Sequence, residues 1–159
     1  MTFIAVFLML DLPQLLALQK VQYDPHWRHG PVSQNHHTLL LLIKGRMKIH
    51  AGGQAVEVGS NHVVFVRAGL LIREQVEASD PPEARLISFT QRNLRDYIPL
   101  ICTDHSLRVR QLIEWIFDEA GASMDDTLAD RTAGILQAIL HQLVYHDHHQ
   151  VPEMVHAVR

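Results

Sequence analysis

Histidine is the residue type in this sequence with the clearest potential for metal chemistry. The chain has 12 histidines, and five have spacings compatible with metal binding: His26, His29, His146, His148 and His149. They lie in polar stretches typical of solvated loops and linkers, so we interpret them as solvent-exposed. His36 and His37 are adjacent in a stretch expected to be extended, where neighbouring side chains point to opposite faces and cannot easily share one ion. The residues therefore predict no metal site, no cofactor and no catalytic residues.

Arginines beside apolar segments indicate a different chemistry, the binding of a small organic ligand. The expected strands supply mainly Leu, Ile, Val and Phe, which favours an apolar or aromatic ligand, and an arginine could pair with a carboxylate on it. Arg67 shares the strand face of Val63 and Phe65, so its guanidinium either enters the barrel or emerges at its rim. Tyr23 and Trp27 either cover the ligand or pack in the core. The candidate ligand-binding residues are Arg28, His36, Arg46, Phe65, Arg67 and Leu71.

Short strands punctuated by glycine must position these residues. Apolar runs or two-residue alternation, bounded by turn residues, predict strands over residues 38–43, 47–50, 54–58, 62–66, 71–76 and 84–89. Residues 78–82, rich in Ser, Asp and Pro, predict a surface loop. Short strands at this spacing predict a β-sandwich or barrel.

The periodicity changes to that of helices near residue 104. Asp104 or Ser106 is expected to cap a helix that ends about Gly121, and Asp125 or Asp126 to open a second one that runs to about Tyr145. Gly134 costs this second helix about 1 kcal/mol relative to alanine, which is tolerable if a neighbouring backbone comes close there. Residues 146–150 are interpreted as a polar linker, and residues 151–159 as the start of a further helix.

Composition and charge exclude several classes of protein. The formal net charge is −3 and the basic residues are scattered, so this segment alone is not expected to bind DNA. Cys102 is the only cysteine, which excludes an intrachain disulfide and makes a cytoplasmic location the default. The apolar run from Phe3 to Leu10 is too short for a membrane span and lacks a basic flank, so we interpret it as a barrel strand or packed arm rather than a secretory signal.

The order of these landmarks resembles the cupin-like sensor domain of AraC-type transcription regulators. The residues that carry the resemblance are the turn 43–46, the glycines at 59 and 69 around the strand 62–66, the stretch from Pro82 to Phe89, and the two helices. The glycines match the family's turns, whereas its Pro-Gly-Asp turn, its Pro-Gly step and its following histidine are replaced. The resemblance implies a mainly β fold, a cupin-like double-stranded β-helix or jelly-roll barrel followed by two α-helices.

The resemblance also implies a division of the chain and a function. Residues 1–100 would form an effector-binding barrel with an N-terminal arm, residues 101–146 a helical dimerisation segment, and residues 147–159 a linker and the start of a helix-turn-helix domain that binds DNA. The second helix could pack entirely on its own barrel, but the resemblance favours a homodimer through Leu128, Ile135, Ile139 and Leu143. The function implied is effector sensing by a regulator, not catalysis, with no membrane partner.

Two alternatives remain open. Cupin enzymes, to which such a fold is similar, hold a metal with a His-x-His pair, a glutamate and a later histidine, and a small metal-dependent isomerase or dioxygenase is the first alternative. This chain has Leu41 and Leu42 where the glutamate is expected and Leu71 at the later histidine position, which argues against it. The second alternative is a structural dimerisation module whose barrel is filled.

Overall fold

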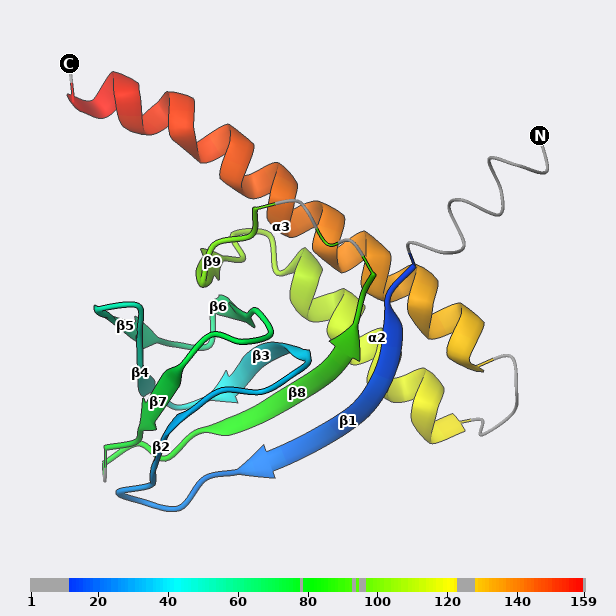
Figure 1. The fold of residues 1–159 in the computed structure, drawn as a ribbon, viewed down its shortest axis with the longest axis horizontal. Coiled ribbons are helices and arrows are strands. Elements are labelled where there is room, and N and C mark those ends of the chain that lie inside the picture. Colours follow the sequence, from blue (N-terminus) through cyan, green and yellow to red (C-terminus); the bar gives the residue numbers. More distant parts are fainter. Residues whose placement is uncertain (1–11, 78, 93, 95–96, 123–127, 159) are drawn as a thin grey trace.

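Two antiparallel sheets and two C-terminal helices make up the described part of the chain (Figure 1). The computed structural model describes residues 12–77, 79–92, 94, 97–122 and 128–158, and in the last helix it describes side chains as far as Val144. The elements, labelled as in Figure 1, are β1 Gln14–Gln22, β2 Arg28–Val32, β3 His37–Lys44, β4 Met47–Ala51, β5 Gln54–Val58, β6 His62–Val66, β7 Ile72–Gln75, β8 Glu83–Thr90, β9 Ile101–Thr103, α2 Arg108–Ala122 and α3 Leu128–Val158. The expectation of a mainly β fold followed by two helices is confirmed.

The two sheets face each other across an apolar core. One has the strand order β1-β8-β3-β6-β9 and the other the order β2-β7-β4-β5. Buried side chains of both meet in one cluster, with Leu40 and Val64 from the five-stranded sheet and Ile49 and Ile72 from the four-stranded sheet. We call this cluster the barrel core. The sheets thus pack face to face, as the expected barrel requires.

The five-stranded sheet is buried on both faces, which explains the unbroken apolar run in β3. Leu40 and Leu42 point into the barrel core, whereas Leu39 and Leu41 belong to a second cluster that includes residues of α2 and α3. We call this second cluster the helix-facing core. Alternation on a strand normally separates apolar from polar side chains, but a strand covered on both faces needs apolar residues at every position.

Both helices cover the outer face of the five-stranded sheet, on the side away from β4, β5 and β7 (Figure 1). The apolar stripe of α3 packs there, since Leu136 and Ile139 are fully buried and Leu140 nearly so. Each such side chain contributes about 1.5–3 kcal/mol when it leaves water. Nothing lies within 4 Å of a Cβ built on Gly134, so the expected close approach of a backbone there is wrong.

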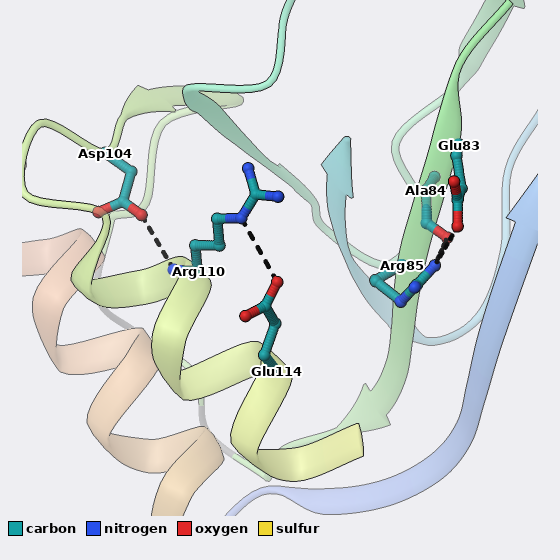
Figure 2. A network of polar contacts seen from close by, with 6 residues as sticks. All are labelled: Glu83, Ala84, Arg85, Asp104, Arg110 and Glu114. Carbon is teal, nitrogen blue, oxygen red and sulfur yellow. Dashed lines mark hydrogen bonds and ion pairs between the residues drawn. The ribbon is translucent and has the colours of Figure 1, made fainter. Parts of the chain in front are cut away.

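The carboxylate of Asp104 decides where α2 begins. Its two oxygens accept hydrogen bonds from the backbone N–H groups of Val109, at 3.2 Å, and Arg110, at 2.9 Å. Figure 2 shows the bond to Arg110. These donors belong to the first turn of the helix, where no carbonyl of the helix itself is available. Of the two caps that the sequence predicts, Asp104 therefore fills the role. Further along α2, Arg110 and Glu114 form an ion pair one turn apart (Figure 2).

Gly45 lets the hairpin turn between β3 and β4 pass close to another loop. Its φ is +85°, and a Cβ at this position would lie 2.5 Å from the Cα of Pro82. The neighbouring N–H of Arg46 donates a hydrogen bond to the carbonyl of Asp80 at 3.3 Å. A side chain at position 45 would meet both a steric clash and an unfavourable backbone conformation.

The structure corrects the sequence-based elements in two places. The sequence predicts a linker over residues 146–150 and a separate helix after it. Both predictions are wrong, because α3 continues without interruption to Val158. The linker residues include no glycine or proline, so nothing in them stops helical hydrogen bonding from propagating. The strands β1, β2 and β9 were not expected. The expected strand or arm over residues 3–10 lies outside the described residues.

Candidate functional site

The site is a cavity of about 340 Å³ between the two sheets. Most of its wall is apolar and comes from inward-facing residues such as Leu40, Ile49, Val66 and Leu86. The strand period places these side chains, because each is two residues from another residue that faces the barrel core. A concave, mainly apolar space of this size suits one small organic ligand.

Polar side chains interrupt this apolar wall at a few points. Four neutral ones line it, Gln19, Gln34, Thr38 and Ser88, and three can carry a charge, His29, His36 and Glu74. Thr38 and Ser88 are directly paired across β3 and β8, so their hydroxyls share one patch of the wall. A few fixed polar groups in an apolar cavity orient a ligand and set its specificity.

Glu74 is the acidic residue among the described lining residues. It lies on β7 between Ile72 and Val76, which both point into the barrel core, and it shares their inward face. Burial raises the pKa of Glu74 above its usual value. Nearby His29 and hydrogen bonds from Trp27 and Tyr23 oppose this effect, because each favours the carboxylate.

The segment between β1 and β2 brings the two donors to Glu74. The N–H of Tyr23 bonds to the carbonyl of Pro82 at 3.0 Å, and the carbonyl of Trp27 accepts from Val76 at 2.8 Å. Tyr23 is buried, and burial together with the charge of Glu74 raises the pKa of its hydroxyl. Both aromatic residues thus pack beside the acid, and Tyr23 belongs to the barrel core, one of the two roles expected for it.

His29 and Trp27 extend this group toward the surface. His29 faces Glu74 directly across β2 and β7, and its ring stacks on the indole of Trp27 with centroids 5.7 Å apart. Trp27 and Tyr23 are also in ring contact, at 5.9 Å. A half-buried carboxylate, its two donors and an imidazole therefore form one polar group at the edge of the cavity.

His36 and His37 lie on opposite faces, as predicted. His36 lines the cavity, whereas His37 packs in the helix-facing direction between Phe65 and Phe89, with centroids 5.6 and 5.4 Å away. The Nδ1 atom of His37 accepts a hydrogen bond from the N–H of Ala68 at 2.9 Å. Burial, and then the nearby charge of Arg67, lowers the pKa of His37 below its usual value. His37 is therefore a neutral structural residue.

Of the six residues proposed to bind a ligand, the cavity wall includes His36. Phe65 belongs to the helix-facing core, on the other side of its sheet. The guanidinium of Arg67 lies over the Phe65 ring and donates to the carbonyl of Leu94 at 3.0 Å, so it neither enters the cavity nor extends freely at the rim. The other three candidates are exposed and lie outside the cavity. Leu71 lies beside a surface hollow, Arg28 on the outward face of β2, and Arg46 in the turn after β3.

Glu74 was missed, although the sequence contains a signal for it. The stretch from Ile72 to Val76 alternates, and the two apolar ends place a charged residue at the inward position between them. Gln19 was missed because β1 itself was not expected. Which strand face points inward depends on how the two sheets pack, and a strand pattern alone does not specify it.

The residues proposed for the dimer interface also need correction. Ile135 is 8% exposed, Ile139 is fully buried and Leu143 is 1% exposed, all within this one chain. They pack on the chain's own five-stranded sheet, so a partner helix cannot reach them in this arrangement. The side chain of Leu128, at the first position of α3, lies outside the described ones. Within the described ranges, no three His, Cys, Asp or Glu side chains come together in a way that could hold a metal ion.

Several solved structures align with part of this chain. Among solved structures, YhaK from Escherichia coli aligns with a TM-score of 0.50 at 16% identity over 58% of this chain and 43% of its own. The polyketide cyclase RemF from Streptomyces resistomycificus aligns at 0.45 and 15%, over 50% and 58% of the two chains. An RmlC-like cupin family protein with a double-stranded β-helix fold from Methanocaldococcus jannaschii aligns at 0.43 and 17%, over 51% and 72%.

The likeness to YhaK concerns the fold alone, and this chain spans less than half of that protein's length. No curated protein matches the sequence. A family model described as the AraC-like ligand binding domain matches residues 20–155, which include the end of β1, all of the other strands, α2, and α3 except its last residues. The chain therefore belongs to the family of AraC-like ligand binding domains.

Proposed function

We propose that this chain is the effector-sensing and dimerisation part of a cytoplasmic transcription regulator. A small organic effector would bind in the cavity between the sheets and control DNA binding by a helix-turn-helix domain of the full-length protein. The observation that carries the proposal is the cavity of about 340 Å³, mainly apolar and lined by a few polar groups, in a chain of this family. A filled barrel, the structural alternative, would leave no such space.

The five-stranded sheet supports a route from ligand to helices. The same strands line the cavity with one face and pack against α2 and α3 with the other, so the effector and the helices are separated by one layer of backbone. An effector can act only if it binds one arrangement of sheet and helices more tightly than another. The proposed dimer contact has to use exposed side chains, because the α3 stripe is buried in the chain's own core.

In the part of the chain that the structure describes, no helix is long and apolar enough to cross a membrane. Contact with DNA would come from residues outside this chain, since the net charge of −3 provides no basic surface for phosphates.

A ligand screen by thermal shift tests the cavity. A ligand present at 100 times its Kd stabilises the folded state by about 2.7 kcal/mol, which raises the melting temperature by roughly 5–10 °C in a chain of this size. The variant Ser88→Phe places a ring in the cavity and is expected to abolish the shift. Ser60→Phe, in the exposed turn after β5, is the matched control.

Two outcomes would contradict the proposal. If ligands shift wild type and Ser88→Phe equally, they bind elsewhere. If the purified protein contains iron, manganese or zinc at one atom per chain, the metal-dependent enzyme is the better account. Sedimentation of the full-length protein with and without the hit compound then tests the dimer.

A further inference from the structure

The groups on the described cavity wall that can carry a charge are one carboxylate and two histidines. Glu74 is its one carboxylate among the described lining residues, and no lysine or arginine is among them. The titratable side chains that face Glu74 are His29 on β2 and Tyr23 in the segment after β1, and His36, just before β3, lines the same cavity. Arg73, next to Glu74 in the sequence, points to the opposite face of β7, where it pairs with His50 in the register.

The surroundings of Glu74 prepare it to accept a further hydrogen-bond donor. The hydroxyl of Tyr23 and the indole N–H of Trp27 both donate to its carboxyl group. A carboxylate has two oxygens with about four acceptor positions, so two donors leave part of its capacity for a ligand. The two bonds also fix the orientation of the carboxyl group toward the cavity that it lines.

Desolvation makes a cation the best complement for this acid. Burial is the largest influence on Glu74, since the carboxylate loses water and gains no guanidinium or ammonium from a described neighbour. Removing a carboxylate from water is costly, and a bound ammonium group would offset that cost further than His29 alone, through a charge-assisted hydrogen bond. A ligand carboxylate would instead be repelled by Glu74 and would find no lysine or arginine on the described wall.

We propose that the cavity selects ligands with an apolar body and a protonated amine, whose ammonium group binds Glu74 while the body contacts Leu40, Ile49 and Leu86. The inference rests on the proposed function, because it names the chemical class of the effector for the same cavity. It differs from the sequence-based expectation of a carboxylate-bearing ligand, which depended on arginines that the structure places outside the cavity.

Matched ligands of one carbon skeleton test the selection directly. Hexylamine, benzylamine and 2-phenylethylamine are each compared with the alcohol and the carboxylate of the same skeleton, by calorimetric titration and thermal shift at pH 7.5. For at least one skeleton, the amine is expected to bind wild type at least about tenfold more tightly than its two counterparts. If alcohols or carboxylates bind as tightly as the amines, or no amine binds, the proposal is overturned without any variant.

Two variants assign the selection to Glu74. Glu74→Gln keeps the size and one acceptor of the side chain but removes the charge, and it is expected to reduce the preference for amine over alcohol to less than about threefold. Glu77→Gln, an exposed glutamate three residues along, is the matched control and should bind as wild type does. An unchanged amine preference in folded Glu74→Gln would overturn the assignment.

The outcomes separate this inference from the proposed function. If ligands of another class bind wild type and Ser88→Phe abolishes that binding, the cavity is a ligand site and only the amine selection fails. If a broad screen yields no ligand whose binding depends on the cavity, the proposed function fails as well.

Discussion

Asp104 connects the sheet to the helices, and replacing it by alanine tests how much that connection contributes. Its oxygens accept hydrogen bonds from the N–H groups of Val109 and Arg110, and the residue is only 3% exposed. The first turn of α2 has no acidic residue of its own. The carboxylate of Asp104 therefore provides the negative charge that complements the positive end of the helix dipole.

The structure gives the size of the expected effect. Loss of an N-cap residue to alanine costs about 0.5–2 kcal/mol. Val109 is 1% exposed, so its N–H would lose its partner away from water, which adds about 1–3 kcal/mol. We expect Asp104→Ala to lower the free energy of unfolding by about 2–4 kcal/mol, and the melting temperature by roughly 5–15 °C. Asp104→Asn keeps one acceptor oxygen and is expected to cost about 1 kcal/mol.

Urea unfolding followed by circular dichroism measures the difference. Asp118→Ala is the matched control, because Asp118 is an exposed aspartate on the same helix, and it should stay within about 0.5 kcal/mol of wild type. Hydrogen exchange at the N–H groups of Val109 and Arg110 should accelerate in Asp104→Ala. If Asp104→Ala is as stable as Asp118→Ala, the capping argument is wrong.

Four further predictions concern stability. Because burial lowers the pKa of His37, the folded state binds a proton there more weakly than the unfolded state, whose pKa is near the usual 6.5. The free energy of unfolding should therefore fall as the pH drops below 6.5, and it should fall less steeply in His37→Asn, which keeps an acceptor. Urea unfolding at several pH values measures this difference. Gly45→Ala should cost at least about 1–2 kcal/mol in thermal melts, since φ is +85° and the Cα of Pro82 lies in the way; an unaffected melting temperature would contradict this. Gly134→Ala should stabilise α3 by about 1 kcal/mol. Ile139→Ala should lower the free energy of unfolding by about 2–5 kcal/mol and leave the oligomeric state, measured by sedimentation, unchanged. Dissociation of a dimer in Ile139→Ala would restore the original interface assignment.

The central strands were predictable because local and tertiary requirements agree in them. The runs that form β3 to β6 are apolar or alternating and end at glycine turns, which is the pattern that a buried strand requires. β1 lies at the edge of its sheet, and its exposed residues do not alternate strictly with half-buried ones, so it has no two-residue signal. β2 contains Gly30 and Pro31, which normally argue against a strand.

The site was harder to predict than the strands. An apolar residue in a strand covered on both faces can serve the ligand or the helices equally well, which is why Phe65 was proposed for the ligand and lies in the helix-facing core. The stripe of α3 presented the same ambiguity between its own barrel and a partner. In both cases the pattern specifies burial but not the surface that provides it.

The layer shared by the cavity and the helices follows a simple numerical rule. On β3, β6 and β8, even-numbered residues such as Leu40, Val64 and Leu86 face the barrel core, and odd-numbered ones such as Leu39 and Ile87 face the helices. Deleting one residue within any of these strands would reverse this parity downstream, turning cavity-facing side chains toward α2 and α3. Evolutionary change in the lining of this wall is therefore restricted to substitutions, and length variation has to occur in the turns.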